Sequence, residues 1–212
     1  ILLTAGPTRE ALDPVRYLTN RSSGKMGYAL AHAFLKAGHQ VLLISGPTQL
    51  EVPDGVDFLP IETAQEMFDS VGRYLGRMDA AVFCAAVADY RPATLATEKI
   101  KKSSDSISLE LVKNPDILGS ARETFGFQGT LVGFAAETEN LEKNSRQKLQ
   151  RKGCDLIVAN DVSKAGVGFD SDRNELLLVY PDRSLPVPED DKTQLATRIV
   201  REIEKLASSC RA

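Results

Sequence analysis

ILLTAGPTREALDPVRYLTNRSSGKMGYALAHAFLKAGHQVLLIS, residues 1–45, contains a strand pattern, a long polar loop, a helix pattern and a second strand pattern. The apolar run at residues 1–5 predicts the first strand, and residues 24–37 have the apolar spacing of a helix that ends at Gly38. Residues 40–45 predict the second strand. This order favours two parallel strands with a helix packed across them.

The same alternation continues along the chain. Further strands are expected at residues 56–61, 80–85, 130–135, 155–159 and 176–180, and further helices at 63–77, 141–152 and 192–206. The strand at 80–85 is fully apolar, which predicts a central position, and the strand at 176–180 is expected at an edge. We therefore predict one α/β domain over residues 1–212, with a Rossmann-like, doubly wound, mostly parallel sheet.

One segment departs from this pattern and predicts an inserted β-arm. Residues 87–102 have no clean period, whereas residues 107–112 alternate and predict a half-buried strand. We expect this strand to pair with residues 98–102 as a hairpin arm that dimerises or folds over a site. A helix is then expected to start within residues 113–117, with Pro115 early in it.

Composition narrows the class of protein. The chain has 212 residues, of which 42% are hydrophobic and 26% charged, as is typical of soluble globular proteins. The formal net charge of −3 argues against nucleic-acid binding, and no apolar run is long enough for a membrane span. Cys84, Cys154 and Cys210 form no CxxC pair, which favours a reducing, cytoplasmic location and no zinc site. The chain begins inside an apolar strand without Met, so we expect that it was cut from a longer one or trimmed.

Small and polar segments follow four of the predicted strands. They are GPTR at 6–9, AAVADY at 85–90, GFAAET at 133–138 and NDVS at 160–163. Ligands of doubly wound sheets bind beyond the carboxyl ends of the strands, so four such segments at one edge favour a binding site over tight turn packing.

The loop RYLTNRSSGKMG, residues 16–27, leads into the first helix. Ser22, Ser23 and Gly24 can present N–H groups to a phosphate there, or Ser can serve simply as a helix cap. The loop is not a Walker A motif, because Met26 stands where Ser or Thr would bind magnesium. It is not a GxGxxG motif directly after the first strand either.

Charged residues elsewhere allow two interpretations each. Lys99 either belongs to a solvated arm or neutralises the oligophosphate of a nucleotide. Lys148 and Lys152, four residues apart on one predicted helix, either bind one anion or provide solubility. Asp89 either holds a nucleotide-bound magnesium ion or forms an Asx turn. Cys84 is expected to be a core residue, not a nucleophile.

Taken together, the motifs resemble the phosphopantothenoylcysteine synthetases, the ligases of coenzyme A biosynthesis. The resemblance is greatest to the CTP-using bacterial form, which is usually fused behind a flavin-dependent decarboxylase. The matching segments are GPTRE at 6–10, DPVRY at 13–17, NRSSGKMG at 20–27, AAVADY at 85–90, EKIKK at 98–102, KNPDI at 113–117, GFAAET at 133–138 and ANDV at 159–162.

This resemblance implies a two-step ligation. The carboxylate of 4′-phosphopantothenate attacks the α-phosphate of CTP, which gives an acyl-cytidylate and releases pyrophosphate. The amine of L-cysteine then attacks the acyl carbon and CMP leaves. The family's important Lys and Asn fall on Lys99 and Asn20, and Arg16 is the basic residue upstream of that Asn.

The resemblance also implies the ligand contacts and the assembly. Residues expected to bind CTP are Ser22, Ser23, Gly24, Ala85, Asp89, Lys99, Asn114, Pro115, Asp116, Ile117, Phe134, Lys148 and Lys152. Asp89 would help to hold Mg²⁺ through the nucleotide phosphates. We expect a homodimer formed through the sheet and the arm. The decarboxylase half is absent from these residues, so flavin binding is not expected here, and whether the native protein carries that half stays open.

Two alternatives belong to other classes. An NAD(P)-dependent Rossmann oxidoreductase would have GxGxxG after the first strand and an acidic residue after the second, which instead ends in Ser45-Gly46-Pro47. A non-catalytic nucleotide-binding module would bind nucleotide without releasing pyrophosphate, and it would not need Asn20 together with Lys99.

Overall fold

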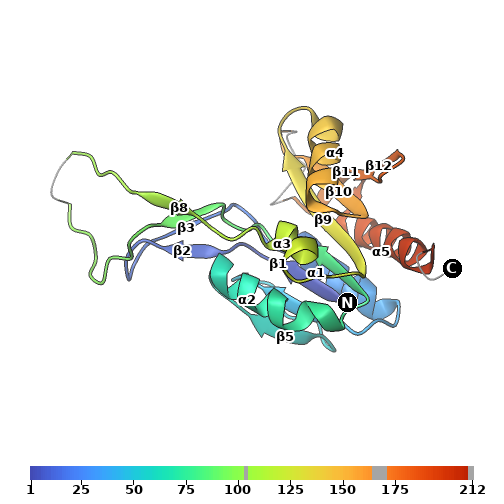
Figure 1. Cartoon of the computed structure of the whole chain (residues 1–212), viewed down its shortest axis with the longest axis horizontal. Helices are drawn as coiled ribbons and strands as arrows, with labels where there is room; N and C mark the ends of the chain where they lie inside the picture. Colours follow the sequence, from blue (N-terminus) through green and yellow to red (C-terminus); the bar gives the residue numbers. More distant parts are fainter. Residues whose placement is uncertain (103–104, 164–170, 210–212) are drawn as a thin grey trace.

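A computed structural model describes residues 1–102, 105–163 and 171–209; Cys210 lies outside these ranges. Its centre is an eight-stranded sheet in the order β12-β11-β10-β9-β6-β1-β4-β5 (Figure 1). The strands are β1 (Leu2–Ala5), β4 (Leu42–Ser45), β5 (Asp57–Pro60), β6 (Ala80–Phe83), β9 (Thr130–Glu137), β10 (Leu156–Asp161), β11 (Arg173–Val179) and β12 (Ser184–Asp191).

Six of these strands are parallel and follow the doubly wound order. The chain moves outward from β1 to β4 and β5, and then returns to place β6, β9 and β10 on the other side of β1. The order therefore reverses between β1 and β6, where doubly wound sheets bind their ligands. The predicted fold class is confirmed, and β6 is central as expected.

Helices cover both faces of the sheet. They are α1 (Lys25–Lys36), α2 (Ala64–Tyr74) with the short 3₁₀ helix η1 (Leu75–Arg77), α3 (Ile117–Glu123), α4 (Leu141–Lys152) and α5 (Lys192–Ser209). α1 and α5 pack on one face with Leu3 and Leu43, whereas α2, α3 and α4 pack on the other with Leu2 and Ile44. Successive strand residues thus bury opposite faces, as strands covered on both sides require.

The limits of two helices follow from local chemistry. The Thr63 hydroxyl accepts the Glu66 N–H at 3.1 Å, and the Glu66 carboxylate accepts the Thr63 N–H, which is the capping box that starts α2. After α1, Gly38 has a φ of 88°, a left-handed conformation that ends a helix without strain in glycine. Both limits agree with the sequence prediction.

The arm consists of two antiparallel pairs, β2 (Arg9–Ala11) with β3 (Tyr17–Thr19) and β7 (Tyr90–Pro92) with β8 (Leu111–Lys113). It projects away from the sheet (Figure 1). The predicted pairing of 107–112 with 98–102 is wrong, because β8 pairs with β7 and residues 98–102 form no strand. Nor is the strand half-buried: Ile107 is 64% exposed and Leu109 44%.

The carboxyl-terminal end of the sheet differs from the prediction as well. β11 is not an edge strand, because β12 pairs with it antiparallel and forms the edge. The sequence of β12 contains Pro186 and Pro188, which obscure a strand pattern but are tolerated at a sheet edge. Pro115 lies outside α3, which begins after its cap residue Asp116.

No helix within the described part of the chain combines the length and the hydropathy needed to cross a bilayer.

Candidate active site

Two adjoining cavities lie at the carboxyl ends of the parallel strands. The α1 cavity, of about 410 Å³, is lined by residues 20–27, 84–87 and 134–136 together with Lys148, Asn160, Val162, Asn174 and Lys192. The α3 cavity, of about 640 Å³, is lined by Thr4, Phe83, Ala85, residues 87–90 and 113–118, Phe134, Lys148, Arg151 and Lys152. Ala85, Val87, Phe134 and Lys148 belong to both, so the two cavities share one wall.

The start of α1 forms one side of the α1 cavity. Its cap residue is Gly24, with a φ of 78° and no side-chain cap; a Cβ there would lie 2.6 Å from Thr48 Cγ2. The Ser22 hydroxyl accepts the Gly24 N–H at 3.3 Å and does not cap the helix. Because Gly24 has no side chain to cap α1, the helix begins beside the cavity without a side-chain cap, which suits an anion. Ser22, Ser23 and Gly24 all line this cavity, in line with the phosphate-binding interpretation.

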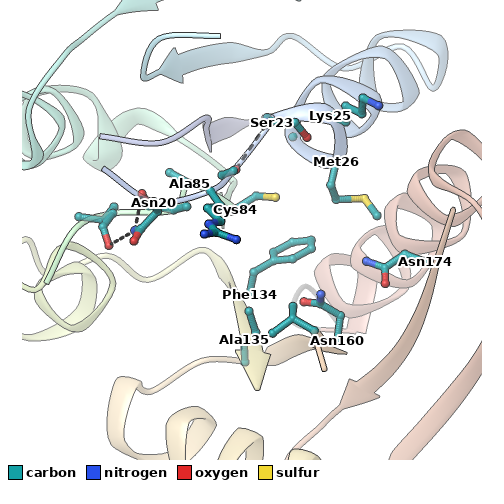
Figure 2. Close-up of a pocket in the computed structure, with 18 of the residues that line it drawn as sticks. Asn20, Ser23, Lys25, Met26, Cys84, Ala85, Phe134, Ala135, Asn160 and Asn174 are labelled. Carbon is teal, nitrogen blue, oxygen red and sulfur yellow. Dashed lines mark hydrogen bonds between the residues drawn. The ribbon is translucent and has the colours of Figure 1, made fainter. Parts of the chain in front are cut away.

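Asn20 lies where β3 ends and holds the segment that follows β6. Its side-chain NH₂ donates to the Ala86 carbonyl at 3.1 Å and the Val87 carbonyl at 3.0 Å (Figure 2). Both of its donors are thereby used, and the side-chain oxygen is the group left for a ligand. Asn20 lines the α1 cavity beside the wall shared with the α3 cavity.

Lys148 is a half-buried lysine in that shared wall. Its ammonium donates to the Phe134 carbonyl at 2.7 Å, and burial lowers its pKa. Lys152, one turn further along α4, instead forms an ion pair with Asp116, so the two lysines hold separate acceptors. The idea that both ammonium groups meet one anion is therefore not the arrangement seen, although both line the α3 cavity.

Asp116 and Asn114 shape the α3 cavity. Asp116 caps α3 by accepting the Gly119 N–H at 3.0 Å; burial raises its pKa, but Lys152 and this N–H lower it overall. The Asn114 amide donates to the Ala88 carbonyl at 2.8 Å and accepts from Arg91 at 3.0 Å. Both residues line the cavity as expected, as do Pro115 and Ile117.

Asp89 is exposed and lines the α3 cavity at the start of the arm. Within the described residues, no cluster of three or more His, Cys, Asp or Glu side chains could hold a metal ion by itself. A single carboxylate fits a magnesium ion that obtains its other ligands from phosphates and water. Asp89 is therefore compatible with a nucleotide-borne metal.

Arg16 and Lys99 line neither cavity. The Arg16 guanidinium pairs with Asp13 and donates to the Ile100 carbonyl at 2.8 Å. Lys99, the neighbour of Ile100, is exposed on the arm. The structure thus brings these two predicted catalytic residues to one place on the arm, but not into the cavities that contain the other predicted residues.

The sequence prediction missed several lining residues of the α1 cavity. They are Arg21, Lys25, Met26, Asn160, Asn174 and Lys192. Asn160 belonged to a segment that the strand pattern already placed at this edge, so a signal existed for it. Asn174 and Lys192 had none, because β11 and α5 bring them in from the unpredicted antiparallel end of the sheet.

Cys84 also lines this cavity, yet burial raises the pKa of its thiol to about 12. The thiol therefore stays protonated near neutral pH and is a poor nucleophile. This agrees with the predicted structural role of Cys84.

Known proteins resemble this chain over most of its length. The family model described as "DNA/pantothenate metabolism flavoprotein C-terminal domain" matches residues 1–206. The Coenzyme A biosynthesis bifunctional protein CoaBC of Vibrio vulnificus (strain YJ016) is 48% identical over 208 residues, which cover 97% of this chain and 52% of that protein. The chain thus spans about half the length of this curated relative.

Solved structures agree. The crystal structure of the C-terminal domain of a CoaBC protein has a TM-score of 0.83 and 37% identity, covering 98% of this chain and 95% of that one. A structure of a Cab2 mutant, H337A, in complex with phosphopantothenate-cysteine has a TM-score of 0.76 at 18% identity, covering 100% of this chain and 88% of that one; this shows a shared fold only. The matched residues, the fold and the cavities agree that the chain belongs to the family of the DNA/pantothenate metabolism flavoprotein C-terminal domain.

Proposed function

We propose that this chain is the ligase domain that joins 4′-phosphopantothenate to L-cysteine in coenzyme A biosynthesis, with CTP as the activating nucleotide. The observation that carries the proposal is the pair of adjoining cavities beyond β1 and β6. A ligation of this type needs a nucleotide and an acid bound side by side. The similarity to a Coenzyme A biosynthesis bifunctional protein CoaBC supports the same pathway.

In the first step the carboxylate oxygen of the acid bonds to the α-phosphorus of CTP, and the bond to the pyrophosphate oxygen breaks. The reaction builds negative charge on the leaving pyrophosphate, so catalysis depends on positioning and cations. The start of α1 would bind phosphate oxygens, with Lys148 nearby in the shared wall. The α3 cavity would receive the nucleoside, between the turn at 114–117 and Phe134.

In the second step the amine of cysteine attacks the acyl carbon and CMP leaves. Asn20 suits this step because its NH₂ is already used and its oxygen can accept a hydrogen bond from the incoming amine. It would orient that amine without adding charge.

Magnesium would accompany the nucleotide. When bound, Mg²⁺ would neutralise part of the phosphate charge. Asp89 is a carboxylate of the α3 cavity that is suited to hold it. Lys99 would contribute a second, mobile cation once the arm approaches a cavity.

The arm supports a homodimer as the functional form. Val15, Leu95 and Ile107 on this arm are 60%, 59% and 64% exposed, and contact with a second copy would remove these apolar side chains from water. Because the arm projects away from the sheet and neither Lys99 nor Arg16 lines a cavity of its own chain, these residues would serve the cavities of the second copy (Figure 1).

A pyrophosphate-release assay tests the proposal. CTP, ATP and UTP are each incubated with magnesium, with and without 4′-phosphopantothenate and cysteine. Release that requires 4′-phosphopantothenate but not cysteine is the expected result, because activation precedes attack by the amine. Nucleotide binding without release would instead identify a binding module, and release with no acid present would contradict the acyl-nucleotidylate step.

A further inference from the structure

Two helices begin side by side at the α1 cavity. Lys25 is the first residue of α1 and Lys192 the first of α5, and both line the cavity. Neither helix has an acidic residue in its first turn. Carboxylates usually lie at the amino end of a helix; α5 has one in its cap residue Asp191, whereas α1 has no side-chain cap, so the start of α1 in particular favours a negatively charged ligand.

The α1 cavity has a strongly positive lining. Four basic residues line it, and no carboxylate does so in the described part of the chain. The four are Arg21, Lys25, Lys148 and Lys192. The whole chain has a net charge of −3, so this cavity is a local reversal of charge.

Lys192 is held in place by its neighbours. Only 7% of Lys192 is exposed, although lysine is rarely so buried. Its backbone N–H donates to the Asp172 carbonyl at 2.9 Å, and the Asp172 carboxylate accepts from Lys25 at 2.7 Å. Asp191 caps α5 by accepting the Gln194 N–H. The two lysine-bearing helix starts are thus joined through Asp172.

Two buried asparagines face the same part of the cavity. Asn160 is 8% exposed and Asn174 5%, and Figure 2 shows both side-chain amides directed toward the space beside Met26 and Phe134. The Asn174 oxygen accepts the Glu175 N–H at 3.0 Å, which leaves its NH₂ for a ligand. The Asn160 side chain has no hydrogen-bond partner within residues 1–102, 105–163 and 171–209. Because both asparagines line the cavity, amide groups not used within the protein are available to a ligand or to water.

We propose that Lys192 and the NH₂ group of Asn174, with Asn160 beside them, form a phosphate-binding subsite at the β10–β11 end of the α1 cavity. The inference rests on the proposed function for the identity of the physiological ligand. Its chemistry is that of a phosphate group, from either the oligophosphate of the nucleotide or the terminal phosphate of the acid. Lys192 supplies the charge, and the amides supply neutral donors that fix the orientation.

Calorimetric titration tests the subsite without turnover, first with inorganic phosphate and pyrophosphate. Lys192→Met removes the charge. Of phosphate and pyrophosphate, the anion that the wild type binds more tightly should bind this variant about tenfold to 100-fold more weakly, the range for a charge-assisted hydrogen bond. Lys192→Arg should retain most of the affinity. The matched control is Lys205→Met on the same helix, whose side chain is 70% exposed, and it should bind like the wild type.

Two further pairs of ligands identify the source of the phosphate. If Lys192→Met loses affinity for CTP but not for CMP, the subsite binds the outer phosphates of the nucleotide. If it loses affinity for 4′-phosphopantothenate but not for pantothenate, the subsite binds the phosphate of the acid. Asn174→Asp adds a negative charge at the subsite and should weaken binding of the same ligand. It provides a second test in case Lys192→Met lowers the thermal midpoint of unfolding. Three results would overturn the proposal. The wild type and both variants could bind every phosphorylated ligand with equal affinity, or the wild type could bind no phosphate at all. The variants could also lose as much affinity for pantothenate as for 4′-phosphopantothenate. Failure of the pyrophosphate-release assay would leave the inorganic phosphate result intact, so the two failures are distinguishable.

Discussion

Among single residues, Asp13 is a buried carboxylate that connects two segments far apart in the sequence. It is 3% exposed, and it accepts the N–H groups of Val15 and Arg16 at 2.9 Å and that of Ile100 at 3.1 Å. The Arg16 guanidinium completes the set. This single carboxylate therefore ties the loop before β3 to the part of the arm next to Lys99.

Asp13→Asn should make the free energy of unfolding less dependent on pH in the acidic range. The hydrogen bond from Arg16, together with the backbone N–H groups, lowers the pKa of Asp13 well below its ordinary 3.8. A carboxylate whose pKa is lower in the folded than in the unfolded protein stabilises the fold fully when the pH is above its unfolded-state pKa. This stabilisation is lost as the pH falls toward the folded-state pKa. The wild type should therefore unfold at higher denaturant concentration than Asp13→Asn at pH 7, and the difference should shrink below about pH 4.

Urea titrations at several pH values provide this measurement. Asp182→Asn is the control, because Asp182 is exposed and forms an ion pair with its neighbour Arg183. An unfolding difference between wild type and Asp13→Asn that stayed constant from pH 7 to pH 3 would show that the carboxylate charge is not what stabilises the loop.

Lys99→Gln and Asn20→Asp should block different steps. Removing a cation that stabilises developing charge costs about 100-fold or more in rate, so Lys99→Gln should release little pyrophosphate and accumulate no acyl-cytidylate. Asn20→Asp should still form the intermediate but pass it to cysteine slowly. Quenched-flow separation of labelled nucleotide measures both. A normal level of intermediate in Lys99→Gln, or normal ligation in Asn20→Asp, would remove the corresponding role.

Among the elements, α1 is distinguished by how closely it lies on β1. A Cβ built on Gly27 would be 2.5 Å from the Cβ of Ala5 and 3.2 Å from its Cα. These are atoms of a strand in the centre of the sheet and cannot swing aside. The close approach sets the position of the helix start, and therefore of the phosphate-facing N–H groups.

Gly27→Ala should destabilise the protein despite the better helix propensity of alanine. Overpacking costs about 1–3 kcal/mol, against a gain of about 1 kcal/mol for replacing glycine in a helix. We expect a net loss of up to about 2 kcal/mol in the free energy of unfolding, measured by urea denaturation. Gly76→Ala is the control, since nothing lies within 4 Å of a Cβ at that position.

The double variant Ala5→Gly with Gly27→Ala removes the overlap. It should be more stable than the sum of the two single changes indicates, because residues in contact do not act additively. Strict additivity would mean that the helix shifts freely and that the close approach has no energetic role.

For the molecule as a whole, the main consequence of the fold is the separation between the arm and the cavities. Lys99 and Arg16 lie with the arm, and Asn20 lines the α1 cavity. If a second copy brings its arm to these cavities, each active site contains residues of both copies.

Mixing two inactive variants tests this arrangement. In a mixed dimer of Asn20→Asp with Lys99→Gln, one site receives both changes and the other receives neither, so activity should recover to about a quarter of the wild-type value on statistical mixing. If each site were built within one copy, every site would keep one defect and no activity would return. Exchange of subunits is verified by mass spectrometry of the mixture.

Local pattern was sufficient for much of this protein. The parallel strands, the helices, the capping box at Thr63 and the Gly38 stop depend on neighbouring residues and on the period of apolar side chains, so the sequence alone indicates them. The rule that ligands bind at the carboxyl ends of parallel strands then locates the segments that line the cavities. The segments that contain Ala85 and Phe134 were found in this way, and Ser22–Gly24 was found as the entrance of a predicted helix.

The remainder depends on contacts between distant segments, which no local pattern encodes. β8 has only three paired residues, and its partner β7 lies about twenty residues away, so the alternation at 107–112 predicted the wrong partner. Lys192 and Asn174 reach the α1 cavity only because β11 and β12 return antiparallel and place α5 beside α1. Residue types and helix periods follow from the chain itself, whereas the charge of the cavity comes from packing, because burial energy depends on which surfaces meet.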